Sequence, residues 1–273
     1  VQVTNFQTYS RRLVFIIFAA LIILIAASFA LLYGFGRYYW SAVIYEREWR
    51  HYQSTADLDR FLTKLDSVVS LNPRSDMSRR AASQAWLLHS SAVFRSYQKD
   101  NEANWQSDLR QAVQAAIAQG SLAVALNPHE PVNWANLGII YHNLVPLDAA
   151  AEEPALTNYQ QASVLDPGNP LWPYQLGLLA YQNQDWPTAK NHFQAALALV
   201  SNYADAHYFL ALTYQQLGLQ GEAIKEMQWV AQFNPDNSLV KEHLFDWQRP
   251  PTPPVPPAIT ELPLEAATPE TEP

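Results

Sequence analysis

The sequence of 273 residues contains no cysteine, and charged residues make up only 15% of it. Without cysteine the chain can form no disulfide, no thiolate nucleophile, no zinc–thiolate site and no iron–sulfur cluster site. Glycine is scarce, at eight residues, and neither a GxxxxGKS/T loop nor a GxGxxG turn for binding phosphates is present. What remains is rich in Ala, Leu, Trp and Tyr, which is enough apolar material for a sizeable core.

The remaining polar side chains show no catalytic or metal-binding pattern. No two of the seven histidines have the H-x3-H or H-E-x2-H spacing of a helical metal site. Glu152 and Glu153 are the only adjacent carboxylates, and we interpret them as solvated. The sequence therefore predicts no enzyme, no cofactor and no metal.

Negative charge gathers in the C-terminal half of the chain. Residues 131–247 contain three lysines, no arginine and eleven acidic residues, within a net charge of −8. Nucleic-acid binding requires clustered Lys and Arg against the phosphate backbone. We therefore expect no nucleic-acid partner.

Near the N-terminus lies an apolar run without charge, from Leu13 to Leu32, in which Ser28 is the only polar residue. At 1.5 Å per residue a helix of this length matches a hydrocarbon core of about 30 Å. We predict a transmembrane helix over 13–36, in contact with the lipid bilayer through Leu13–Leu32, with Tyr33, Tyr38, Tyr39 and Trp40 at the far interface. The alternative is a cleaved signal peptide ending at Ser28-Phe29-Ala30.

The flanking charges give a weak indication of topology. Arg11 and Arg12 favour a cytoplasmic location for the N-terminal segment 1–12, while the arginines within 37–50 compete from the other side. We expect a single-pass membrane protein with an extracytoplasmic C-terminal domain; a cytoplasmic scaffold of opposite topology is the alternative. Because the sequence opens on Val1 rather than Met, we expect a fragment or a processed form.

One pattern recurs in three units, 131–169, 170–203 and 204–235. The first unit has W-x2-L-G-x2-Y, and the matching residues of the units are Trp134, Leu137, Gly138 and Tyr141; Leu176 and Gly177; and Leu210, Ala211 and Tyr214. A second stretch follows with a small-large-small spacing, at Ala155, Tyr159 and Ala162; Ala189, Phe193 and Ala196; and Ala223, Met227 and Val230. The period is 34 residues between the second and third units and 39 between the first two, because about five extra residues lie around 147–153.

This pattern resembles the tetratricopeptide repeat (TPR), a 34-residue helix–turn–helix. The resemblance implies an all-α fold in which the N-terminal transmembrane helix precedes a TPR-type right-handed α-solenoid. Gly138, Gly177 and Ala211 lack bulk, so that paired helices can approach closely. Larger side chains are expected to fill the space between hairpins: Trp134, Tyr141, Tyr159, Phe193 and Tyr214.

Flanking segments complete the predicted organisation. Residues 37–130 indicate irregular TPR-like hairpins, which gives about five hairpins in all. Residues 236–247 are typical of a capping helix that covers the last apolar face. The Pro/Glu-rich tail 248–273 is expected to be disordered, because it has too few aliphatic residues for a core.

In the TPR family the first helix of each unit lines a concave, partner-binding groove. The resemblance therefore places a protein or peptide partner against an aromatic and aliphatic surface, to which the third unit also contributes Asp205. Its candidate residues are Val132, Ala135, Ile139 and His142; Leu171, Tyr174, Leu178 and Tyr181; and Tyr208, Leu212 and Gln215. Some of these side chains could instead pack against the next hairpin.

A narrower likeness rests on Asn127-Pro128-His129-Glu130-Pro131 followed by the W-x2-L-G-x2-Y motif. With the preceding membrane helix, it resembles the C-terminal TPR part of bacterial O-antigen ligase-like membrane proteins. The expected function is a membrane-tethered protein–protein interaction module, an adaptor for an envelope-associated complex. The alternative is an accessory TPR domain of a multi-span glycan ligase or polymerase.

Overall fold

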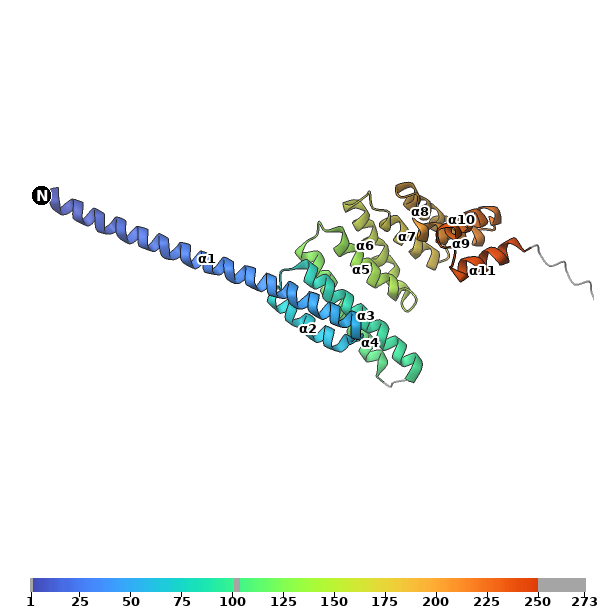
Figure 1. Cartoon of the computed structure of the whole chain (residues 1–273), viewed down its shortest axis with the longest axis horizontal. Helices are drawn as coiled ribbons and strands as arrows, with labels where there is room; N and C mark the ends of the chain where they lie inside the picture. The colour runs from blue at the N-terminus through green and yellow to red at the C-terminus, as the bar shows by residue number, and fades with distance from the viewer. Residues whose placement is uncertain (1, 101–103, 250–273) are drawn as a thin grey trace, which may run out of the picture.

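The structure is a computed structural model that describes residues 2–100 and 104–249. All regular elements in these residues are helices, as predicted, and they form five hairpins and a terminal helix (Figure 1). The helices are α1 (Gln2–Thr55), α2 (Leu58–Leu71), α3 (Asp76–Asp100), α4 (Trp105–Leu126), α5 (Pro131–Leu144), α6 (Glu152–Leu165), α7 (Leu171–Gln182), α8 (Trp186–Leu199), α9 (Ala204–Gln216), α10 (Gln220–Phe233) and α11 (Ser238–Gln248). A short 3-10 turn, η1 (Ala149–Ala151), precedes α6. The predicted disordered tail lies, from residue 250, outside the described residues.

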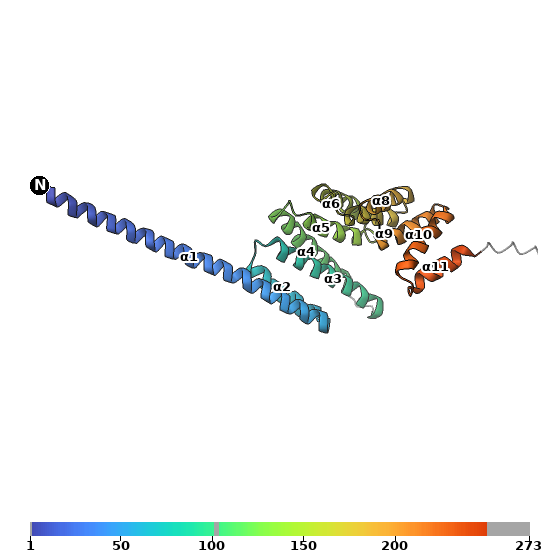
Figure 2. The same ribbon diagram turned by 45° about the horizontal axis from the view of Figure 1, so that its top comes forward.

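Helix α1 projects far beyond the stack of hairpins (Figures 1 and 2). Its 54 residues span about 80 Å. It runs through Gly34 and Gly36 without interruption and continues past residue 36, where the predicted transmembrane segment ends. The large apolar side chains from Leu13 to Leu32 are between 48% and 76% exposed, and this part of α1 is long and apolar enough to cross a membrane.

The second half of α1 packs along α2 and joins the long helix to the stack. Trp49 and Tyr52 contact Phe61, with ring centroids 5.7 and 5.4 Å apart. Beside them Glu48 is buried, and its carboxylate accepts from the guanidinium of Arg60 at 3.0 Å. This hydrogen bond, together with one from Arg47, holds the pKa of Glu48 below its usual value. The ion pair and the aromatic contacts together join α1 to α2.

A buried polar hub connects the irregular hairpin α3–α4 to the first regular repeat. Asn133, in the first turn of α5, donates to Asp76 at 3.0 Å and accepts from Arg80 at 2.6 Å. Its amide also donates to the carbonyl groups of Ala123 and Asn127. Every polar atom of this side chain is thus paired although it is fully buried.

Turn residues account for the helix ends. Asn127, Asp166 and Asn234 each end a helix and precede a proline that cannot continue it. The turns inside the second and third repeats need a left-handed residue at the same place, which is Gln184 with φ 61° and Gly218 with φ 73°. The residue type therefore differs while the backbone conformation is shared.

Candidate peptide-binding surface

A small residue faces a large one at the crossing of the two helices in each repeat. A β-carbon added to Gly138 would come within 2.7 Å of the Tyr159 ring, and one added to Gly177 within 2.6 Å of the Phe193 ring. In the third repeat Ala211 lies in one core cluster with the flexible Met227. These contacts set the spacing within each hairpin and align α5, α7 and α9 as a row.

The other predicted packing residues lie in or beside the core. The buried ones are Leu137, Ala162, Ala189, Ala196 and Ala223, and the half-buried ones are Trp134, Tyr141 and Tyr214. The Trp134 indole donates to the carbonyl of Pro128 at 2.7 Å, and the Tyr214 hydroxyl accepts from Gln194 at 2.9 Å. Trp134 thus ties α5 to the turn before it.

The predicted groove residues of α5, α7 and α9 differ in accessibility. Val132 is 40% exposed, whereas Ala135 and Tyr174 are buried. The half-buried ones are Ile139, His142, Leu171, Leu178, Tyr181, Tyr208, Leu212 and Gln215, and Asp205 is exposed. A partner lying on this row would contact a narrower apolar surface than the sequence suggests.

Tyr174 belongs to an aromatic cluster between the second and third repeats. Its ring centroid lies 4.9 Å from that of Tyr203 and 6.1 Å from that of Phe209, and at 8% exposure it faces the next hairpin. Burial raises the pKa of its hydroxyl, which stays protonated. A peptide could contact this side chain only after displacing its neighbours.

The terminal helix α11 covers the groove residues of the third repeat. The Tyr208 hydroxyl lies 3.3 Å from the Nε2 atom of His243, and Leu212 packs in a cluster with Val240 and Trp247. Helix α11 (Ser238–Gln248) thus lies over part of the surface assigned to a partner.

His142 ends the row in the first repeat. Its Nδ1 atom lies 3.3 Å from the Tyr159 hydroxyl, which donates to Gln175 of the next repeat at 3.3 Å. Burial lowers the pKa of His142 and favours the neutral ring. The three side chains form a bridge between repeats.

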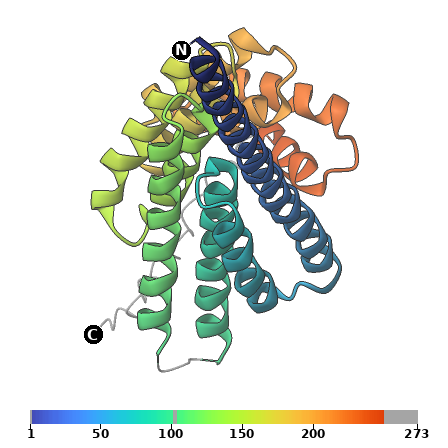
Figure 3. The same ribbon diagram turned by 90° about the vertical axis from the view of Figure 1, so that its left-hand side faces the viewer.

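A hollow that sequence reasoning missed lies where the stack changes width. Helices α3 and α4 are longer than α5 and α6, and their hairpin extends past them (Figure 3). At this step lies an apolar hollow of about 540 Å³ between α3, α4 and the end of α5. Its lining includes Leu88, Phe94, Leu109, Val113 and Leu147. Two features of the sequence could have indicated this hollow: the long helical pair before residue 127 and the insertion around 147–153.

The polar groups of this hollow are largely satisfied within α3. The hydroxyls of Ser90 and Ser91 both donate to the carbonyl of Leu87, at 2.7 and 3.1 Å. Arg95 is the one charged residue of the lining, and its Nε atom donates to the Ser91 carbonyl. The hollow therefore offers apolar surface with one cationic group at its edge, a composition suited to apolar side chains of a ligand.

No arrangement for metal-dependent chemistry occurs in the part of the chain that the structure describes. Within residues 2–100 and 104–249, no group of three or more His, Asp or Glu side chains is placed to hold a metal ion.

Two solved structures resemble the fold over most of the chain. A TPR protein of Thermus thermophilus has a TM-score of 0.55 at 17% identity, with 76% of this chain and 98% of that chain covered. A tetratricopeptide repeat protein of Parabacteroides merdae has a TM-score of 0.54 at 15% identity, with 76% and 72% covered. No family model and no curated protein matches the sequence. The likeness confirms the predicted TPR fold and, at these identities, concerns the fold alone.

Proposed function

We propose that the chain is a membrane-tethered adaptor whose TPR stack binds an apolar segment of a partner protein, as part of an envelope-associated complex. The observation that carries this proposal is the hollow between α3, α4 and the end of α5, because it is apolar, open and built on packed helices. Its volume falls within the range of ordinary ligand sites. The role is one of binding and holding, without catalysis.

The tether is supported by the exposure of α1. Twenty successive residues carry no charge, and the one polar group among them, the Ser28 hydroxyl, donates to the Leu24 carbonyl at 2.8 Å. Such internal pairing is what a helix in hydrocarbon requires. The exposed rings of Tyr33, Tyr39 and Trp40 follow at the depth of an interfacial aromatic belt.

The partner segment should be amphipathic, with large apolar anchors on one face and an acidic residue near Arg95. An amphipathic helix placed in an apolar groove contributes anchors about one turn apart. Leu88 of α3 and Leu147, which follows α5, both line the hollow; they are 38% and 59% exposed and are the expected contacts.

Photo-crosslinking of the full membrane-embedded chain tests this proposal. A benzoylphenylalanine placed at Leu88 or Leu147 should capture the same partner species. One placed at Val164, which is 73% exposed at the far end of α6, should not capture it. Leu88→Asp should weaken capture from position 147 at least about tenfold, because it places a charge in an apolar contact. Equal capture from Val164, or an unchanged yield in Leu88→Asp with a normal circular dichroism spectrum, would contradict the proposal.

Sidedness can be determined directly because the chain has no cysteine. A Val164→Cys variant provides a single thiol on the repeat domain. We expect labelling by a membrane-impermeant maleimide in intact cells, as an extracytoplasmic location requires. Labelling only after lysis would instead assign the module to the cytoplasm.

A second candidate is the accessory domain of a multi-span glycan ligase or polymerase, which the narrower sequence likeness suggests. The exposed apolar face of α1 is the one observation that favours this alternative, because further transmembrane helices of such an enzyme would pack against that face. Further apolar spans encoded directly upstream would support this alternative, and the same hollow would then recruit partners to that enzyme.

A further inference from the structure

The turn between α2 and α3 lies against α1 just beyond the apolar run. A cavity of about 430 Å³ opens there, lined by Gly34, Arg37 and Tyr38 of α1, by Leu71 at the end of α2, and by Asn72, Pro73 and Arg74 of the turn. Gly34 and Tyr38 follow Leu32 by two and six residues, or about 3 and 9 Å along the helix. If α1 spans the bilayer, this cavity lies within or beside the headgroup layer, which is roughly 5–7 Å thick on each side.

One arginine of this cavity is held firmly. Arg37 donates from Nε to the carbonyl of Leu71 at 2.8 Å and from Nη2 to that of Ser70 at 2.7 Å. It thereby caps the C-terminus of α2, where a cation is favoured by the helix dipole. The guanidinium is thus positioned at the cavity by the helix that it caps.

The second arginine, Arg74, adds another cation to the cavity lining. Arg74 is exposed, and within residues 2–100 and 104–249 its side chain makes no hydrogen bond or salt bridge. The cavity lining contains no acidic residue. The nearest acid along the chain, Asp76, accepts instead from Asn127 and Asn133, at 3.2 and 3.0 Å. Two positive charges therefore face one cavity without a counter-charge, which suits an anion.

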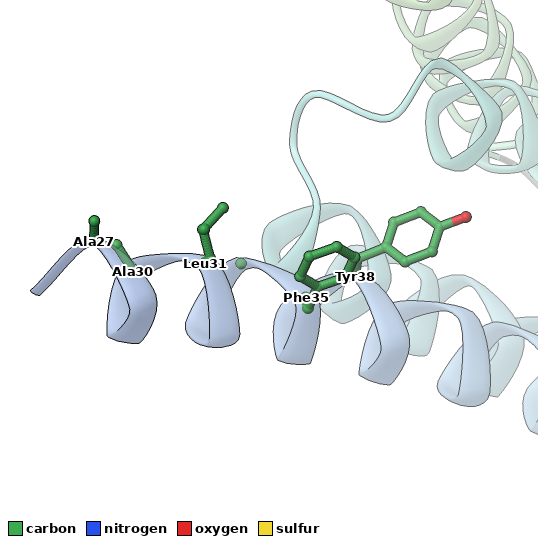
Figure 4. Close-up of a pocket in the computed structure, with 6 residues that line it drawn as sticks. Ala27, Ala30, Leu31, Phe35 and Tyr38 are labelled. Atoms are coloured by element: carbon green, nitrogen blue, oxygen red, sulfur yellow. The ribbon is translucent and has the colours of Figure 1, made fainter. Parts of the chain in front are cut away.

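An apolar hollow adjoins this cavity along α1. Ala27, Ala30, Leu31, Gly34, Phe35 and Tyr38 line about 640 Å³ of open space, and the labelled side chains lie along one side of the helix (Figure 4). Gly34 and Tyr38 line both spaces. The order along α1, apolar and then cationic, is the order of an acyl chain and a phosphate in a lipid.

We propose that this compound site binds a phosphate-bearing anionic lipid of the bilayer. The phosphate lies between Arg37 and Arg74, and one acyl chain follows Leu31 and Phe35 into the membrane. Bound lipid draws the α2–α3 turn to the membrane surface and orients the stack relative to it. This inference rests on the membrane insertion that the proposed function assumes.

Native mass spectrometry of the full chain in mild detergent tests the site, with phosphatidylglycerol and phosphatidylcholine titrated separately. Phosphatidylglycerol should bind at least about fivefold more tightly, since a basic residue near a membrane contributes about that factor. Arg74→Gln should remove most of this preference, and Gly34→Leu, which fills the shared wall, should weaken phosphatidylglycerol binding. Arg110→Gln removes an equally exposed arginine remote from the cavity and should change nothing.

The outcomes separate the possible explanations. Equal binding of the two lipids, or equal losses in Arg74→Gln and Arg110→Gln, would overturn the site. Displacement of the lipid by millimolar inorganic phosphate would show that the cavity takes free anions, and would overturn the assignment to a lipid. Flotation of the chain with phosphatidylcholine vesicles is the separate check on insertion. Its failure would remove the tether itself, whereas a floating chain without lipid preference would refute only this inference.

Discussion

Substitution of Gly177 by alanine should destabilise the second repeat, although alanine is the better helix former. The added β-carbon would lie 2.6 and 2.7 Å from two carbons of the Phe193 ring, well inside van der Waals contact. The ring cannot withdraw easily, because it is fully buried and stacks on Phe209 with centroids 5.9 Å apart. Overpacking costs about 1–3 kcal/mol and alanine regains about 1 kcal/mol of helix propensity. We therefore expect a net loss of up to about 2 kcal/mol.

The third repeat supplies the compensating change, since it pairs Ala211 with Met227 in the same arrangement. Gly177→Ala combined with Phe193→Met should therefore lose less stability than the sum of the two single variants, by about 1 kcal/mol or more. Gly221→Ala is the control: no atom lies within 4 Å of the added carbon, so this variant should gain stability. Urea unfolding of the detergent-solubilised chain, followed by circular dichroism, measures all four. Additive losses, or stabilisation by Gly177→Ala, would refute the steric argument.

Four further substitutions test local features. Gln184→Gly should raise the free energy of unfolding in urea titrations by about 0.5–1 kcal/mol, because glycine adopts the left-handed backbone conformation of this position without strain. Gly218→Ala should lower it by a similar amount for the opposite reason. Burial lowers the pKa of His142 in the folded protein. The free energy of unfolding should therefore fall as the pH decreases from about 7, through the ordinary histidine pKa, to the lowered pKa of the folded state. His142→Gln should show a smaller loss of stability over this pH range. Asn133→Ala should cost about 2–3 kcal/mol in thermal unfolding, because Arg80 loses its acceptor and Asp76 keeps only Asn127 of its two side-chain donors. An unchanged melting curve would refute this role.

The repeat architecture was predictable because it depends on local pattern. Gly138 and Gly177 recur at a fixed place, and in the structure each meets an aromatic ring of its paired helix. Periodicity does not report how closely the next hairpin approaches. Tyr174 was assigned to the groove because it lies on the correct helix face, yet Tyr203 and Phe209 of the following unit bury it.

Two other features depend on relations between distant elements. The sequence predicts a transmembrane helix that ends at residue 36, whereas α1 continues to Thr55 and its second half contacts Phe61 of α2. The hollow near Leu88 exists because one hairpin is longer than the next, and a single helix pattern does not contain that difference. The sequence therefore predicted the fold and a candidate face for a partner, but not the hollow between α3, α4 and the end of α5.

Hydrogen–deuterium exchange of the membrane-embedded chain, with and without the cross-linked partner segment, tests the central proposal most directly. If the partner binds in the hollow between α3, α4 and the end of α5, amide exchange should slow over residues 87–95 and 143–147 and stay unchanged in α7 and α9. Protection confined to α7 and α9 would place the partner on the row of first helices instead, and protection of neither region would leave the adaptor proposal without a binding surface.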